Sequence, residues 1–282
     1  MADIRKVATR QSYGEALVEL GAAHDDFVVL DADLAAATPT GKFKAAYPDR
    51  FIDVGVAEQN LMGVAAGIAT TGHRVFASTF AMFAAGRAFE QVRNSIGYPH
   101  LHVVIGATHA GMSVGEDGAT HQCNEDLALM RAIPGMTVIV PADDVEAKAA
   151  VRAAYEAEGP VYVRLGRLPV PVIHKDDYHF ELGRGVIERE GSDVTVIACG
   201  LEVPAALEAA KTLADKGVSC EVINMATIKP LDEELVLRAA KECGRIVTVE
   251  EHNILGGLGE AVAAVAAEHI PVPIHRIGVR DE

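Results

Sequence analysis

The chain has 282 residues, half of them apolar, and 25 Lys and Arg against 40 Asp and Glu give a formal net charge of −15. At roughly 150 residues per domain, this length predicts two domains. A surface so negative repels polyphosphate backbones and anionic lipid, so neither nucleic acid nor a membrane is an expected partner. No apolar stretch approaches the roughly 20 residues of a membrane-spanning helix.

The start of the chain and the cysteines indicate a compartment. The first six residues, Met-Ala-Asp-Ile-Arg-Lys, lack the apolar core of a signal peptide, so no export is expected. The four cysteines form no CxxC pair, and most have apolar neighbours, which predicts reduced core residues and neither zinc ligands nor disulfides. A cytoplasmic protein is therefore expected. The cysteines are Cys123, Cys199, Cys220 and Cys243.

In the first half of the chain, short apolar runs typical of strands alternate with segments of helical spacing. The expected strands are 27–30, 51–54, 75–77, 101–105, 136–140 and 161–163. The expected helices are 13–23, 57–70, 83–95 and 143–157. Ser12 and Glu15 fit a capping box at the first helix. The nearly continuous apolar strand runs predict a parallel sheet covered by helices on both faces.

Prolines, charges and aromatics interrupt this alternation between about Leu168 and Arg189, which predicts a linker. The alternation then resumes with strands expected at 194–198, 220–224, 246–249 and 273–277 and helices at 204–216, 232–243 and 259–268. The sequence therefore predicts an α/β protein of two three-layer α/β domains with mostly parallel sheets. The expected bounds are 1–167 for the first domain, 168–189 for the linker and 190–282 for the second domain.

A glycine-rich polar segment, Thr108 to Gln122, directly follows the strand expected at 101–105. It contains three glycines, two histidines and two acidic residues. Parallel α/β sheets bind ligands at the carboxyl ends of their strands, so this composition predicts a site for a polar substrate. For any one of these residues, a solvated loop whose Asp and Gly only make turns is the alternative.

This segment, with Thr-His followed by Val-Gly-Glu-Asp-Gly-Ala-Thr-His-Gln, resembles the pyrimidine-binding domain of transketolases. The similarity extends to Leu-Asp-Ala-Asp-Leu at 30–34, Phe-Ile-Asp-Val-Gly-Val-Ala-Glu-Gln-Asn at 51–60, Ser-Thr-Phe-Ala-Met-Phe at 78–83 and Pro-Ala-Asp at 141–143. Ile-Lys-Pro-Leu-Asp at 228–232 and the segment 250–259 resemble the family's C-terminal domain. The family's Gly-Asp-Gly motif and downstream Asn, which hold magnesium, have no counterpart here. The chain therefore resembles the C-terminal subunit of a split transketolase.

The resemblance implies thiamine diphosphate as the cofactor. Its diphosphate and Mg²⁺ or Ca²⁺ would be held by a partner, the N-terminal transketolase subunit, and no metal ligands are expected in this chain. Glu58 is implied as the catalytic residue that shares a proton with the aminopyrimidine ring. Its position at a helix start among apolar residues predicts burial and a protonated carboxyl. Without the resemblance, a carboxylate that complements the helix dipole is the safer interpretation.

Two aromatic residues at a strand-to-helix junction are implied to bind the same ring. By the resemblance, Phe83 stacks on the ring and Phe80 lines the pocket, whereas the residues alone would indicate ordinary core. The family often has a third aromatic residue at the position of Gly86. Asp33 is implied to lie near the cofactor.

The polar segment and two arginines are implied to bind the substrate. Asp117 would bind the hydroxyl beside the scissile bond, while His109 and His121 contact the reacting oxygens, where a histidine of near-neutral pKa can shuttle a proton. Arg10 and Arg167 resemble phosphate-binding arginines, since guanidinium forks suit a phosphate dianion. Surface positions are the alternative for these arginines. Arg164 is a near neighbour of Arg167, and the register leaves both open.

The resemblance implies a transferase of the pentose phosphate pathway type, which moves a two-carbon ketol unit from a ketose phosphate to an aldose phosphate. It would act only with the separate diphosphate-binding subunit. Self-pairing through the helix at 57–70 would make the complex a heterotetramer. The alternatives are a deoxyxylulose-phosphate synthase-like enzyme, a 2-oxo-acid dehydrogenase beta subunit and a non-catalytic subunit. The segment 115–118 and its flanking histidines favour sugar substrates.

Overall fold

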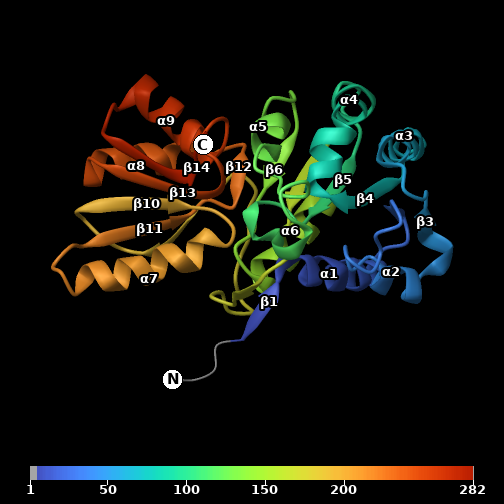
Figure 1. Cartoon of the computed structure of the whole chain (residues 1–282), viewed down its shortest axis with the longest axis horizontal. Coiled ribbons are helices and arrows are strands. Elements are labelled where there is room, and N and C mark those ends of the chain that lie inside the picture. The colour runs from blue at the N-terminus through green and yellow to red at the C-terminus, as the bar shows by residue number, and fades with distance from the viewer. Residues whose placement is uncertain (1–4, 282) are drawn as a thin grey trace.

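The structure, a computed structural model, describes residues 5–281. The expectation that no export signal is present depends partly on residues 1–4, which lie outside the described residues, as does residue 282. Two α/β halves lie side by side, the first coloured blue to green and the second orange to red (Figure 1). Within residues 5–281, no helix is both long enough and apolar enough to cross a membrane.

The first sheet has seven strands in the order β12-β6-β7-β5-β4-β2-β3. Every neighbouring pair from β6 to β3 is parallel, which confirms the sheet type predicted from the continuous apolar runs. The edge strand β12 (Thr227–Lys229) is antiparallel to β6 and comes from the second half of the chain. The other strands are β2 (Phe27–Asp31), β3 (Phe51–Asp53), β4 (Arg74–Phe80), β5 (Val103–Thr108), β6 (Thr137–Ile139) and β7 (Val161–Arg164).

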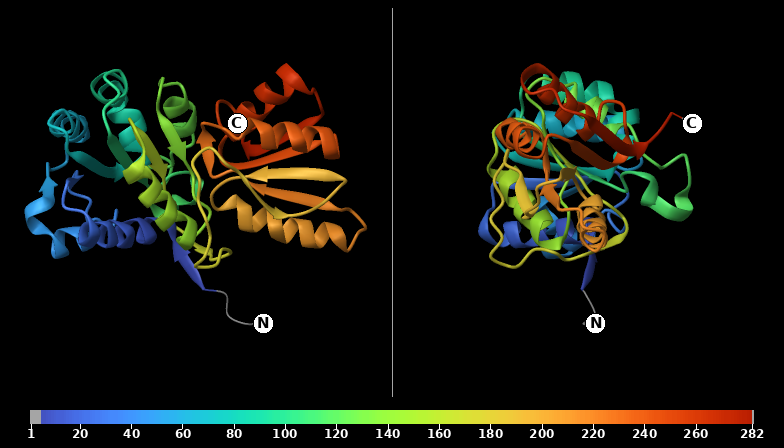
Figure 2. Two further views of the ribbon diagram at one scale, coloured as in Figure 1. Left: turned by 180° about the vertical axis from the view of Figure 1, so that it is seen from behind. Right: turned by 90° about the vertical axis from the view of Figure 1, so that its left-hand side faces the viewer.

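Helices cover both faces of this sheet (Figures 1 and 2). The apolar side chains of α1, α2 and α6 form a core cluster on one face, and those of α3 and α5 join the cluster on the other. The helix expected over 83–95 is irregular, because π-helical turns at Phe83–Arg87 and Val92–Gly97 flank the short α4. The helices are α1 (Thr9–Ala23), α2 (Gly41–Ala46), α3 (Glu58–Ala69), α4 (Phe89–Gln91), α5 (Asp126–Arg131) and α6 (Asp144–Glu156).

The second sheet has five strands in the order β14-β13-β10-β11-β9, all parallel except β9. One face packs on α7 (Glu202–Ala214), and the other on α8 (Glu233–Cys243) and α9 (Leu258–His269) (Figure 1). The strands are β9 (Val186–Arg189), β10 (Val194–Ala198), β11 (Cys220–Asn224), β13 (Ile246–Asn253) and β14 (Ile274–Val279). The mostly parallel, three-layer α/β architecture predicted for both halves is confirmed.

Some local expectations are wrong. The capping box does not form: α1 begins at Thr9 without a side-chain cap, and the Ser12 hydroxyl, inside the helix, donates to the Ala8 carbonyl. The strand β1 (Lys6–Ala8) leads straight into α1 and pairs with β8 (Pro169–Pro171), so tertiary pairing sets the helix start. The segment 168–189, expected to be a linker, contains both β8 and β9.

The two halves share one apolar core. Ile197 and Ile223 of the second sheet belong to the same buried cluster as Val138 of β6 and Val140, which follows β6. The site is therefore built on a scaffold in which neither half is independent of the other.

All four cysteines are free, and three of them are buried, whereas Cys243 is half-buried.

Candidate active site

The predicted site residues gather where β2, β3, β4 and β5 end. Glu58, the first residue of α3, follows β3 and is only 2% exposed. Phe80 ends β4 and is the register partner of Thr108 at the end of β5, so His109 lies beside it. Because the strands are parallel, their carboxyl ends share one edge of the sheet, as expected for a ligand site in this fold class.

The buried carboxylate of Glu58 has a cationic partner that sequence reasoning missed. The Arg87 guanidinium donates to Glu58 Oε2 over 2.9 Å, and its central carbon lies 4.5 Å from the centroid of the Phe83 ring. A flat cation therefore touches both the carboxylate and the aromatic face. In the sequence, the i, i+4 spacing of Phe83 and Arg87 was the signal that their side chains could meet. Glu58 is buried as predicted, but the guanidinium adds a neutralising charge beside it.

The aromatic side chains form one stack. The rings of Phe80 and Phe83 lie 5.7 Å apart at an angle of 15°, and the His109 ring stacks on Phe80 at 3.9 Å. The ring of His121 meets Phe83 edge-on at 5.4 Å. Residues from β4, from the end of β5 and from the polar segment thus line one wall of the site. At the position of the family's third aromatic residue, Gly86 is exposed, and a Cβ there would lie 2.4 Å from the Met82 methyl group.

His109 is held in an uncommon backbone conformation. Its φ is +59°, in the left-handed region that few non-glycine residues adopt, and such strain concentrates at functional sites. The ring is buried, and Nδ1 lies 2.9 Å from the Thr108 hydroxyl. Burial, and then the positive charge of Arg10, lower the pKa of His109 to about 4. The expected near-neutral pKa is therefore wrong for His109, whose ring is neutral at pH 7.

The polar segment extends from the body as a loop after β5 (Figure 2, right). A 3-10 helix over Met112–Asp117 is kinked at Gly115, and Asp117 is exposed at its end. An isolated bridge between Gly111 and Cys123 closes the base of the loop. The predicted Asp117 and His121 thus lie on one loop whose two ends are tied together.

The three candidate phosphate-binding arginines have different environments. Arg164 is buried and bonded to Asp126, with Nε to Oδ2 at 2.8 Å, so it is committed to the interior. Arg167 is partly exposed, and it donates to the Val114 carbonyl over 2.6 Å and to Glu116 over 2.9 Å. Of Arg164 and Arg167, only Arg167 is accessible to a substrate.

Arg10 and Arg167 line an open hollow of about 540 Å³, together with Lys6, Gln11, Glu15 and the segment 168–169. Arg10 donates to the Ala37 carbonyl over 2.6 Å. Burial and the neighbouring charge of Arg167 lower the pKa of Arg10, whereas Asp117 raises it. The two guanidinium groups are therefore close enough to act together on one anion.

Asp33 lies at the same sheet edge, two residues beyond β2, but it is exposed and has a φ of 61°. Its backbone N–H donates to Asp53 Oδ1 over 3.0 Å. The buried acid of this turn is Asp31, which accepts bonds from Leu34, Thr38 and Thr40, and burial raises its pKa. Asp33 is therefore positioned as a surface acid at the rim.

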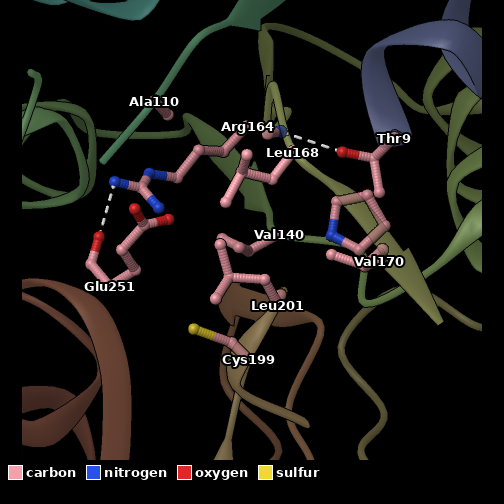
Figure 3. A pocket seen from close by; sticks show the side chains of 12 residues that line it. Thr9, Ala110, Val140, Arg164, Leu168, Val170, Cys199, Leu201 and Glu251 are labelled. Carbon is pink, nitrogen blue, oxygen red and sulfur yellow. Dashed lines mark hydrogen bonds between the residues drawn. The ribbon is translucent and has the colours of Figure 1, made fainter. Parts of the chain in front are cut away.

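A small cavity lies between the two halves, beside the ends of β6 and β7 (Figure 3). Arg164, Thr9, Cys199 and Glu251 line it, and its volume of about 20 Å³ has room for about one water. It is therefore too small to be the substrate site. Within residues 5–281, no group of three or more His, Cys, Asp or Glu side chains is arranged to hold a metal ion.

Fold and site together define a two-domain α/β protein that presents a ligand site at the carboxyl ends of parallel strands. Two family models match the sequence: the transketolase pyrimidine-binding domain over residues 5–172 and the transketolase C-terminal domain over residues 183–282. The chain belongs to the transketolase family.

Its relatives include separate transketolase subunits. The chain is 51% identical to a transketolase C-terminal section of Methanocaldococcus jannaschii, over 96% of this chain and 86% of that protein. It is 44% identical to the 6-deoxy-6-sulfo-D-fructose transketolase subunit of Clostridium sp., over 96% of this chain and 84% of that protein. It spans 44% of the transketolase-like protein 2 of Bos taurus, at 41% identity.

Solved structures have the same fold. One described as a split-gene transketolase, inactive beta4 tetramer, superposes with a TM-score of 0.92 at 55% identity, over 98% of this chain and 90% of that one. The transketolase of Campylobacter jejuni superposes with a TM-score of 0.81 over 97% of this chain and 42% of that one, at 24% identity, which shows the fold alone.

Proposed function

We propose that this chain is the C-terminal subunit of a thiamine diphosphate-dependent transketolase. In this proposal, it moves a two-carbon ketol unit from a ketose phosphate to an aldose phosphate. A separate diphosphate-binding subunit holds the cofactor's diphosphate and Mg²⁺ or Ca²⁺, and the chain alone is inactive. One observation carries the proposal: the planar Arg87 guanidinium bonds to the buried Glu58 carboxylate and lies on the Phe83 ring.

The residues at this position fit an aminopyrimidine ring. The Arg87 guanidinium is planar, carries N–H donors, bonds to Glu58 and lies on Phe83, and a protonated heterocycle makes the same two kinds of contact. When bound, thiamine diphosphate supplies a nucleophilic thiazolium carbon and an electron sink. Glu58 holds a proton at the ring nitrogen, and Phe80 and Phe83 fix the plane of the ring. Asp33 is proposed as a rim residue near the cofactor.

The polar side chains around the stack suit a sugar phosphate. Neutral His109 donates to or accepts from the reacting oxygen, and His121, edge-on to Phe83, contacts the same oxygen from the loop. Asp117 accepts from the hydroxyl beside the scissile bond. At the other end of the substrate, Arg10 and Arg167 bind the phosphate from the hollow that they line.

The proposed assembly has two copies of this chain and two copies of the partner. Support comes from Val56, which is 76% exposed, and from Ile52, which is 37% exposed, both beside the entry to α3. The exposed face of α3 carries Gly63 and Gly67 with open space around them, which permits a close helix contact. Four free thiols and sugar phosphate substrates support a cytoplasmic location.

The decisive test combines the purified chain with a polypeptide that carries the diphosphate-binding domain. Ketol transfer between xylulose 5-phosphate and ribose 5-phosphate is expected only from the mixture, in the presence of thiamine diphosphate and Mg²⁺. Full turnover by the isolated chain would contradict the requirement for a partner. Acceptance of pyruvate with glyceraldehyde 3-phosphate would instead indicate the deoxyxylulose-phosphate synthase reaction.

A further inference from the structure

One carboxylate of the second half reaches the polar loop of the first. Glu251 lies near the end of β13, is 8% exposed, and its Oε1 accepts the backbone N–H of Ser113 over 2.5 Å. Ser113 is the second residue of the 3-10 helix that ends at Asp117. A hydrogen bond from a backbone N–H to an ionised carboxylate is among the stronger kinds in proteins. The second half thus holds the loop at the start of the segment that carries Asp117.

The close approach of Glu251 depends on local features on both sides. Gly111 has a φ of +81°, and a Cβ there would lie 2.3 Å from Glu251 Cδ, so a side chain at this position would displace the carboxylate. Arg164 Nη2 donates to the Glu251 carbonyl over 2.9 Å (Figure 3). It also donates to the Cys123 carbonyl over 3.2 Å. The Asp126 carboxylate fixes Arg164 in turn. The backbone of Glu251 is therefore tied to the base of the same loop.

The loop has a second attachment, made by the first half alone. Arg167 donates to the Val114 carbonyl over 2.6 Å and pairs with Glu116. Arg167 also lines the open hollow that it shares with Arg10, here named the phosphate hollow because it is proposed to bind the substrate phosphate. Substrate binding would therefore compete with this attachment. The bond from Glu251 to Ser113 involves neither the phosphate hollow nor the aromatic stack. It can therefore persist while Arg167 exchanges Glu116 for a phosphate.

We propose that Glu251 is a positioning residue of the active site. Its carboxylate anchors residues 112–121, here named the substrate segment, so that Asp117 and His121 keep their places against the aromatic stack. The consequence for sugar binding rests on the proposed function, whereas the anchoring itself does not. In this assignment, the C-terminal domain contributes a contact that orders the substrate site.

Amide hydrogen exchange of the full chain, followed by mass spectrometry, tests the anchoring without activity. Glu251→Ala removes the acceptor, and we expect exchange in peptides covering 112–121 to accelerate about tenfold, while β4 and β5 keep their protection. Glu251→Gln keeps an acceptor oxygen and should restore most of the protection. Unchanged exchange in Glu251→Ala would overturn the proposal.

Glu250→Ala is the matched control. The Glu250 carboxylate accepts the N–H groups of Leu258 and Gly259 at the start of α9, so its loss weakens the second half without touching the substrate segment. If Glu250→Ala accelerates exchange in 112–121 as much as Glu251→Ala does, general destabilisation is the cause and the proposal is wrong.

Kinetics with the partner subunit supply the second readout. Glu251→Ala should raise the KM for the sugar phosphate about tenfold and leave the affinity for thiamine diphosphate, measured by calorimetry, unchanged. A loss of cofactor affinity with an unchanged KM would overturn the positioning role. An inactive wild-type mixture would count against the proposed function only, since the exchange result stands without it.

Discussion

At the scale of single residues, Glu58 is distinguished by its burial beside the Arg87 guanidinium, whose side chain is 51% exposed. Glu58→Gln keeps the size of the side chain and a donor to a ring nitrogen but cannot share a proton. We expect the turnover of the reconstituted enzyme to fall by about 10²–10⁴-fold, the range for a lost acid–base group, with the melting temperature unchanged. Exchange of the thiazolium proton, followed by NMR, is the direct measurement.

Glu90→Gln provides the control for this change. Glu90 is an exposed carboxylate that accepts bonds from Gln91 and Asn94, so its replacement should leave turnover at the wild-type rate. Near-wild-type proton exchange in Glu58→Gln would contradict the proton-sharing role and leave Glu58 as a charge that complements the dipole of α3.

If Arg167 binds the substrate phosphate as proposed, Glu116 competes with the substrate for this arginine. Arg167 lowers the pKa of Glu116 to about 2, so this carboxylate stays ionised at any pH at which the enzyme works. Glu116→Gln removes the competing charge, and we expect a KM for the sugar phosphate that is about two- to fivefold lower, with kcat unchanged. The measurement is a comparison of steady-state kinetics for phosphorylated and unphosphorylated donors. Glu125→Gln, which replaces an exposed acid bonded to the Asn124 N–H, is the control.

The grouping of the proposed site residues was predictable, because they follow strands that end at one sheet edge. Glu58, Phe80, Phe83, His109 and His121 could be grouped from motifs alone. Arg87 needed the three-dimensional position of its guanidinium between two predicted residues. Glu251 lies 138 positions from Ser113 along the chain, and no spacing rule connects residues so far apart. Contacts that depend on the packing of one half on the other were invisible in the sequence.

At the scale of elements, the exposed face of α3 makes a separate prediction. Gly67 has nothing within 4 Å of an added Cβ, so Gly67→Glu fits the isolated chain and replaces a poor helix former. Across a two-fold axis the new charges would repel, and we expect the chain to lose self-association. Light scattering on the isolated chain measures this, with Gly67→Gln as the uncharged, size-matched control. Continued self-association of Gly67→Glu would exclude α3 from the interface.

Elements with long apolar patterns were predictable, and those held by tertiary pairing were not. The strands at 194–198 and 220–224 have the predicted bounds, because their apolar runs are buried on both faces. The caps of α6 and α8 are the acids that begin the expected helices, Asp143 and Asp232. By contrast, β8 and β12 have three residues each and exist only through their partners β1 and β6.

At the scale of the whole molecule, His174 connects the two halves. Its Nε2 lies 2.9 Å from Glu188 of β9, and its Nδ1 lies 3.1 Å from Asp143, the cap of α6. Glu146 and the ring of Tyr178 also face it. Burial lowers the pKa of His174, but Asp143 and Glu188 outweigh it and raise the pKa to about 10. The histidine is therefore a cation between carboxylates from both halves.

This arrangement predicts a pH-dependent stability. A pKa raised above the unfolded value of about 6.5 gives stabilisation that is complete below that pH and is lost as the pH rises towards 10. His174→Gln should therefore lower the free energy of unfolding by ~1–3 kcal/mol at pH 6, and the difference should shrink by pH 10. Chemical denaturation at several pH values measures it.

The exposed His179 is the control residue, since His179→Gln changes a histidine five positions along the same segment without removing a buried partner. It should match the wild type at every pH. A His174→Gln effect of equal size at pH 6 and pH 10 would show that size and packing, rather than charge, account for it.

The edge strand β12 belongs to the first sheet although it lies in the second half of the sequence. The first half of the sequence alone is therefore not a complete folding unit. It covers β6 with the pairs Thr227 to Ile139 and Lys229 to Val138, and Lys229 Nζ also donates to the carbonyls of Arg131 and Ile133. A fragment cut after residue 189 would keep the pairing of β6 with β7 but leave the other edge of β6 without a partner, and exposed strand edges invite pairing between molecules. Such a fragment should aggregate, although it would contain every residue of the proposed cofactor site. Any shortened version of the pyrimidine-binding half must therefore include residues 227–229.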